Sequence, residues 1–187
     1  MGLPTPACSP DRVCDDPSAE ISVAVQANDA SRILDAVGHQ AAYVFGNSGR
    51  AITALELVIR HPEQVLAPVA HEPPLVNLLP DASALFGEVD AIMATYKSEG
   101  AAAAMWQFAM FAGMVPRGTA GPGPAMARAQ DASPSPNLFL GNMLVPITRY
   151  VADRATLTTT AIRISVGVGN ASAEQVANRS ALALAAL

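Results

Sequence analysis

The sequence contains few charged residues, few cysteines and no long hydrophobic run, and each shortage excludes a class of protein. Charged residues make up 14% of the 187 positions and hydrophobic residues 51%, which is typical of a packed globular domain and not of a disordered chain. The net charge of −5 provides no basic surface for nucleic acid or anionic lipid, so neither is expected as a partner.

The cysteines are Cys8 and Cys14, too few for a disulfide framework or a zinc site, and no metal or cofactor is expected. We interpret them as free thiols, without deciding whether they pair. The most membrane-like stretch, residues 101–115, is shorter than the ~20 residues that cross a bilayer. The N-terminus has prolines and charges where a signal peptide has an apolar segment, so we expect one cytoplasmic domain.

The clearest pattern lies between residues 41 and 70. A short apolar run, residues 41–46, predicts a buried strand, and Ala51, Leu55 and Val58 fall on one face of a helix that Pro62 ends. Residues 65–70 predict a second strand. Such a strand–helix–strand unit favours parallel strands and places the protein in the α/β class.

Other segments have weaker but readable patterns. Helices are expected over residues 21–37 and 81–99, in the alanine-rich segment around Trp106, and over residues 173–187. Residues 115–136 are expected to form a loop, and residues 137–150 a helix that Pro146 kinks or ends. The β-branched run within residues 159–168 predicts a third strand.

The first strand leads into Gly46-Asn47-Ser48-Gly49. A strained turn that presents a serine at the start of a helix needs small residues around it. There, the backbone N–H of the following residue can stabilise an oxyanion. The alternative is a glycine-rich turn with an incidental serine.

The stretch around this turn closely resembles bacterial hydrolases of the α/β-hydrolase fold. The matching residues are 42–49, 54–57, 60–62 and the segment Ala70-His71-Glu72-Pro73-Pro74. The resemblance implies a short, mainly parallel sheet with flanking helices and an inserted helical lid. It also implies a division of the chain into an irregular segment 1–20, a hydrolase core 21–75 and 156–187, and a lid 76–155.

In this family a serine attacks an ester carbonyl, a histidine accepts its proton, and an acid orients the histidine. The resemblance therefore implies Ser48 as nucleophile and the Gly49 N–H as oxyanion donor. For the acid we favour Glu72, although it could instead be a structural carboxylate that fixes the Glu-Pro-Pro turn. The usual position, after the third strand, offers no carboxylate before Glu174.

The sequence departs from the family pattern in three places. Arg50 replaces the last glycine of the motif, where its side chain either crowds the strand or reaches solvent. The N-terminal strands are not recognisable, and the histidine-bearing segment is absent before Leu187, which suggests truncation at both ends. His39, His61 and His71 are interpreted as structural or exposed residues.

Two functions follow from these observations. The first is a serine esterase for a small apolar ester or a related acyl compound, with an apolar pocket formed by Trp106, Phe108 and Phe111 unless these residues are plain core. The second is a non-catalytic or truncated hydrolase-like protein. Homo-oligomers are compatible with either, because so short a sheet leaves edges and an apolar face to cover.

Overall fold

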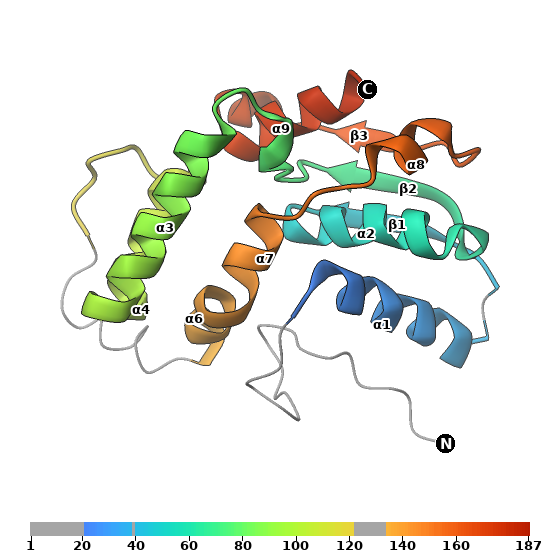
Figure 1. Cartoon of the computed structure of the whole chain (residues 1–187), viewed down its shortest axis with the longest axis horizontal. Coiled ribbons are helices and arrows are strands. Elements are labelled where there is room, and N and C mark those ends of the chain that lie inside the picture. Colours follow the sequence, from blue (N-terminus) through green and yellow to red (C-terminus); the bar gives the residue numbers. More distant parts are fainter. Residues whose placement is uncertain (1–20, 39, 122–133) are drawn as a thin grey trace.

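The computed structural model describes residues 21–38, 40–121 and 134–187, and it confirms the α/β class. Within these residues the three strands form one parallel sheet in the order β1-β2-β3, with β1 at Ala42–Asn47, β2 at Val65–His71 and β3 at Ser165–Gly167. The helices surround the sheet or extend to one side of it (Figure 1): α1 Val23–Ala36, α2 Gly49–Arg60, α3 Ala82–Glu99, α4 Ala101–Phe111, α6 Pro134–Leu138, α7 Leu144–Thr148, α8 Arg154–Thr159 and α9 Val176–Ala185. Cys8, Cys14, His39 and the predicted irregular segment 1–20 lie outside the described residues, as does most of the predicted loop 115–136.

The β1–α2–β2 unit forms with the order and parallel direction that the sequence predicts, but the prediction of a buried first strand is wrong, since the alternate residues Tyr43 and Phe45 of β1 are exposed. Helix α2 lies across β1 and β2, and α1 packs alongside α2 (Figure 1), where Ala27 shares a hydrophobic cluster with Val44 of β1 and Val65 of β2. Ile52 and Leu55 are completely buried on α2, and they join Ile21 and Val23 in the main core. Pro62 follows α2 and starts a short 3₁₀ turn that leads into β2. This local packing fixes the ends of two neighbouring strands.

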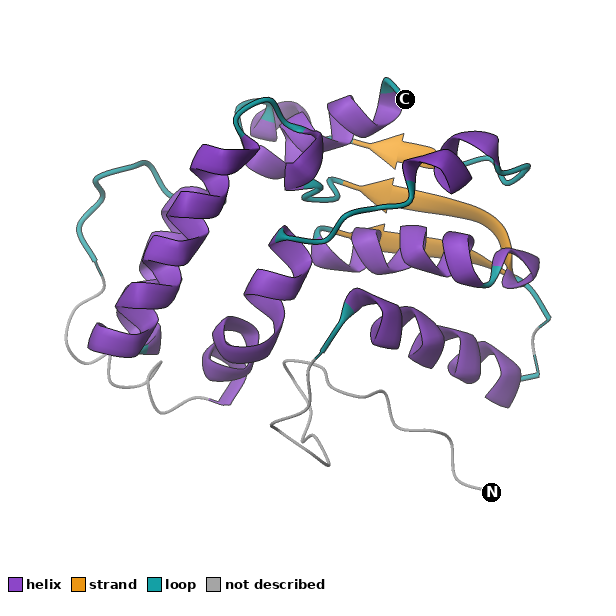
Figure 2. Ribbon diagram, viewed as in Figure 1, coloured by secondary structure: helices purple, strands orange, loops and turns teal. Residues whose placement is uncertain are grey.

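A second group of helices, coloured purple at the left of Figure 2, lies beside the carboxyl ends of the strands. Helices α3 and α4 pack against each other around a core that includes Val89, Ile92 and Phe111. Only Gly100 separates them, and its φ of 93° lies in the region that favours glycine. The two helices therefore fold back on each other instead of continuing as one rod. None of the described helices is both long and apolar enough to cross a membrane.

The third strand is shorter than the sequence suggests. Residues 159–168 predict a long strand, but only Ser165–Gly167 pairs with β2, and Arg154–Thr159 is helical. Asp153 caps α8, because its side chain accepts hydrogen bonds from the backbone N–H and the hydroxyl of Thr156. The helix thereby takes Thr159 out of the predicted strand, and residues 160–164 form a connection without strand pairing.

The predicted helix 137–150 is divided, but Pro146 does not end it. A π-helical turn, Phe139–Met143, separates α6 from α7, and Pro146 lies in the first turn of α7. The wider turn accommodates the missing N–H of the proline.

One face of the sheet is less covered than the other. Tyr43 and Phe45 of β1 point away from α2 and are 81% and 70% exposed. Val69, which pairs with Phe45, is also exposed. Parallel sheets usually have helices on both faces, so this apolar surface is unusual for the fold.

Candidate active site

Ser48 lies between the end of β1 and the start of α2, in a backbone conformation that residues other than glycine rarely adopt. Its φ and ψ are 54° and −127°, and such strain typically costs ~1–3 kcal/mol. The Ser48 N–H donates a hydrogen bond to the carbonyl of His71, the last residue of β2, at 2.9 Å. The side chain is exposed. The strand, turn and helix predicted around Ser48 are therefore present, with the strain concentrated on the serine.

The two glycines of the motif differ in whether the surrounding atoms leave room for a Cβ atom. A Cβ atom on Gly46 would lie 2.4 Å from the Arg50 carbonyl oxygen and 2.7 Å from the Ala51 Cα, which leaves room only for glycine. A Cβ atom on Gly49 would lie 3.0 Å from Cδ1 of Ile147, the movable end of a side chain. Gly46 is therefore the residue that lets β1 and α2 approach each other.

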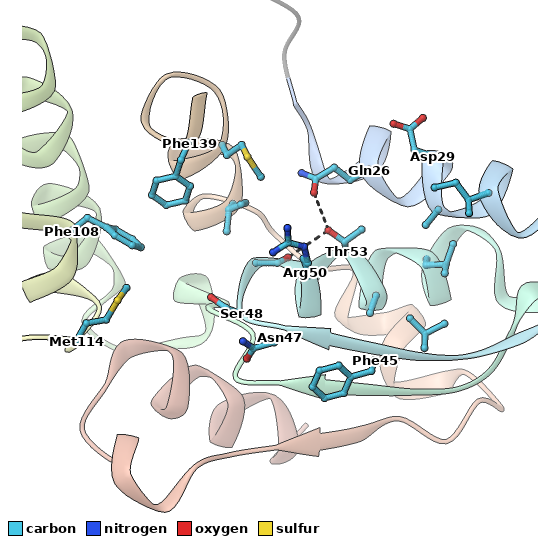
Figure 3. A pocket seen from close by; sticks show the side chains of 18 of the residues that line it. Gln26, Asp29, Phe45, Asn47, Ser48, Arg50, Thr53, Phe108, Met114 and Phe139 are labelled. Atoms are coloured by element: carbon cyan, nitrogen blue, oxygen red, sulfur yellow. Dashed lines mark hydrogen bonds between the residues drawn. The ribbon is translucent and has the colours of Figure 1, made fainter. Parts of the chain in front are cut away.

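Arg50 does not crowd the strand. Its side chain is exposed and extends into the region between α1 and the helices at the carboxyl edge (Figure 3). Among the described residues Arg50 makes no ion pair. The departure from the family motif therefore places a cation next to Ser48 without disturbing the turn.

A cavity of about 550 Å³ opens at Ser48, Gly49 and Arg50. One wall comes from β1 and α2, the second from α1 with Gln26 and Asp29, and the third from the helices after residue 75 (Figure 3). The third wall is apolar and contains Met105, Phe108, Met114, Phe139, Met143 and Ile147. Such a space suits a small, largely apolar molecule.

Of the three aromatic residues predicted to shape this pocket, only Phe108 lines the cavity. Phe108 lines the cavity and contacts Phe139, with ring centroids 4.8 Å apart. Phe111 is buried in the core between α3 and α4, and the indole N–H of Trp106 bonds to the carbonyl of Thr119. The methionine-rich part of the wall was not predicted, because methionine at helical spacing is as common in an ordinary core.

Glu72 follows β2 as Ser48 follows β1. Its φ is 49°, and its N–H donates to the carbonyl of Gly167, the last residue of β3, at 2.9 Å. The side chain reaches the loop after β3, where one oxygen, Oε1, accepts from the Gly169 N–H at 2.8 Å, from the Ser172 hydroxyl and from the Asn178 amide at 3.4 Å. No described residue bonds to the other oxygen, Oε2.

These contacts keep Glu72 ionised. Burial of the carboxyl group raises its pKa, but the hydrogen bonds from Ser172, Gly169 and Asn178 lower it more. The nearby His71 acts in the same direction, so the pKa of Glu72 lies below its ordinary value. Asn178 is 2% exposed and also donates to the Gly169 carbonyl at 3.0 Å. The sequence analysis missed Ser172 and Asn178. The signal for Asn178 is a polar residue on the apolar face of α9, whereas Ser172, in the short turn before α9, has none.

The structure brings Ser48, Gly49 and Glu72 to one edge of the sheet, because Asn47 and His71 are paired across β1 and β2. Neither described histidine is bonded to the Ser48 hydroxyl. The His71 Nδ1 lies 2.8 Å from the Asn47 amide oxygen, and the His61 Nε2 lies 2.9 Å from that of Asn28. Glu174 is exposed and lines a different cavity.

Comparison with known proteins agrees with this architecture. A solved α/β hydrolase from Sphaerobacter thermophilus DSM 20745 superposes with a TM-score of 0.56 and 22% identity, over 90% of this chain and 64% of its own. An uncharacterised hydrolase from Bacillus subtilis (strain 168), YraK, is 47% identical over 57 residues, or 30% of this chain and 21% of the relative. No protein-family model matches the chain. The chain thus spans about a fifth of the curated relative and under two thirds of the solved structure, and the fold that it has is the α/β-hydrolase fold.

Proposed function

We propose that this protein is a serine hydrolase of the esterase type that acts on a small apolar ester or a related acyl compound. The observation that carries this proposal is the strained Ser48, exposed at the N-terminus of α2 and on the wall of an apolar cavity. Strain at an exposed serine is an expense in stability that a merely structural turn does not need.

The reaction begins when Oγ of Ser48 forms a bond to the acyl carbon. The ester C–O bond then breaks, and the serine proton leaves with the departing alcohol. The N–H of Gly49, the first residue of α2, stabilises the negative charge that develops on the carbonyl oxygen. Water releases the acyl group as a carboxylic acid and restores the hydroxyl.

Glu72 is the acid in this proposal. Its Oε1 is held by three donors, while Oε2 is left without a partner among the described residues. A carboxylate fixed by one oxygen and ionised at neutral pH can orient an imidazole with the other. Its place at the end of β2, next to the strand that leads to Ser48, supports the same role.

Residues 76–155 form the lid in this proposal, and residues 21–75 and 156–187 form the core. Support comes from the apolar wall of the cavity, since Met105, Phe108 and Phe139 all belong to the inserted segment. The exposed Tyr43 and Phe45 support the further proposal that copies of the chain associate through the sheet. Light scattering after size-exclusion chromatography measures that association directly.

A fluorophosphonate probe tests the nucleophile. We expect labelling of the intact protein at Ser48 and loss of labelling in Ser48→Ala. Ser83→Ala, at an exposed serine of α3 away from the cavity, serves as the control and retains the label. A folded protein that the probe leaves unmodified contradicts the esterase proposal.

A second function, a non-catalytic hydrolase-like binding protein, is favoured by one observation. Neither His61 nor His71 contacts the Ser48 hydroxyl, so the described residues provide no bonded base for it. This alternative expects a small acyl compound to bind in the cavity with equal affinity in the intact protein and in Ser48→Ala, without turnover in either.

A further inference from the structure

Arg50 is distinguished among the arginines of the described residues by two features together: it lines the Ser48 cavity, and it has no carboxylate partner there. Arg32, Arg60, Arg117, Arg149 and Arg179 each pair with a carboxylate. Arg154 and Arg163 have no such pair, but they line no cavity described here. Arg50 alone among these arginines lines the cavity of Ser48.

The position of Arg50 is electrostatically unfavourable with respect to its own helix. It lies in the first turn of α2, where the helix already carries a partial positive charge. Asp29, on the opposite wall, forms an ion pair with Arg32 at 3.1 Å and none with Arg50. A cation at this position is repelled by the positive end of the helix dipole, and no carboxylate among the described residues forms an ion pair with it.

An anion in the cavity reverses this balance. A carboxylate near Arg50 gains from the guanidinium and from the positive end of α2 at the same time. The planar guanidinium matches a carboxylate with two parallel hydrogen bonds, which a lysine cannot provide. The rest of the cavity, including Met105, Phe108 and Phe139, suits an apolar chain.

We propose that Arg50 determines specificity by binding a carboxylate of the substrate, so that the site takes an ester whose acyl chain ends in a second, free carboxylate. This inference rests on the proposed function, since the ester is cleaved at Ser48. The scissile carbonyl lies at Ser48 and the Gly49 N–H, and the free carboxylate lies at Arg50. The carbon chain between them contacts the apolar wall.

Hydrolysis of matched esters tests the proposal. The anionic substrates are the mono-p-nitrophenyl esters of succinate, glutarate and adipate, and the neutral ones are p-nitrophenyl butyrate and valerate. We expect kcat/KM to be higher for one anionic ester than for the neutral ester of similar length. Arg50→Gln lowers kcat/KM for the anionic ester by about tenfold to a hundredfold, as expected for a lost charge-assisted hydrogen bond, and leaves the neutral ester unchanged.

Arg154→Gln is the matched control, because Arg154 is an exposed arginine near a helix start and outside the cavity. We expect Arg154→Gln to leave kcat/KM unchanged for both the anionic and the neutral ester. An equal loss for both esters in Arg50→Gln overturns the proposal and assigns Arg50 to the oxyanion or to the fold. Equal use of both ester classes by the intact protein also overturns it, while leaving the esterase function intact.

A binding measurement keeps the proposal testable if no ester is cleaved. Calorimetry with Ser48→Ala measures the affinity for monomethyl glutarate and for methyl butyrate. We expect the anionic compound to bind more tightly, and about tenfold more weakly after Arg50→Gln is added. Failure of hydrolysis with this binding pattern contradicts the catalytic function alone, whereas equal binding with and without Arg50 contradicts the anion site.

Discussion

Ser48 and Glu72 have the same place in the backbone and opposite surroundings. Each follows the last residue of a parallel strand, each has a positive φ, and each donates its N–H to the last carbonyl of the next strand. The Ser48 side chain is exposed beside an apolar cavity, whereas the Glu72 carboxylate is held by the loop after β3.

The same strained turn has a different effect on stability at each of the two residues. At Glu72 the hydrogen bonds of the side chain offset the backbone strain, so the residue contributes to stability as well as to any chemistry. At Ser48 no side-chain hydrogen bond among the described residues offsets the strain. The Ser48 backbone conformation costs stability, and we expect that the serine can be replaced without a further loss. This combination is typical of a functional site.

The largest effect is expected from removing the space that the Ser48 turn requires. Gly46→Ala places a Cβ atom 2.4 Å from a backbone oxygen, and we expect it to lower the free energy of unfolding by roughly 3 kcal/mol or more. Gly87→Ala, on α3 with nothing within 4 Å of its added Cβ, is the control. It should stabilise the protein by about 0.5–1 kcal/mol. Equal effects of the two variants in urea unfolding would show that the strand and helix do not depend on Gly46.

A smaller loss is expected at Glu72. Glu72→Ala leaves the Gly169 N–H without its acceptor and should lower the free energy of unfolding by about 2 kcal/mol. Glu72→Gly loses the same contacts but removes the backbone strain, so it should be about 1 kcal/mol more stable than the alanine variant. The exposed Glu63 is the control, and Glu63→Ala should change stability by less than about 0.5 kcal/mol. If the alanine variant at residue 72 is as stable as the intact protein, the loop after β3 does not depend on the carboxylate.

Substitution of Ser48 should change the free energy of unfolding in the opposite direction. Ser48→Gly relaxes the positive φ and should raise the free energy of unfolding by about 1 kcal/mol, while Ser48→Ala should leave it nearly unchanged. Both variants should lose fluorophosphonate labelling. A loss of stability in Ser48→Gly, measured by thermal unfolding, would mean that the serine side chain supports the turn.

The smallest effect is the pH dependence that Glu72 confers. Because its folded-state pKa is lowered, its contribution is complete above the ordinary pKa of 4.5 and is lost as the pH falls through the folded-state value. The intact protein should therefore be more stable than Glu72→Gln at pH 7, and the difference should narrow from pH 5 to pH 3. A constant difference over this range, in denaturant titrations, would show that the carboxyl group does not titrate with folding.

The sequence predicted the local parts of this arrangement and missed the distant ones. The β1–α2–β2 unit could be predicted because its apolar periods, its glycines and Pro62 are all local signals. The partners of Glu72 could not, since Ser172 and Asn178 follow it by 100 and 106 residues. The direction of the Arg50 side chain was equally open, because its position in the motif does not tell strand from solvent.

Gly100 does not line the cavity at Ser48, yet its backbone conformation helps to set the size of the molecule that the cavity accepts. It is the one residue between α3 and α4 and has a φ of 93°, and the reversal that this φ allows brings Met105 and Phe108 to the cavity. An ordinary L-residue at this position favours the opposite hand, and the 18-residue and 11-residue helices could then stack end to end. The extent of the cavity thus depends on a backbone conformation that the achiral Gly100 adopts without strain, in a segment that does not carry Ser48.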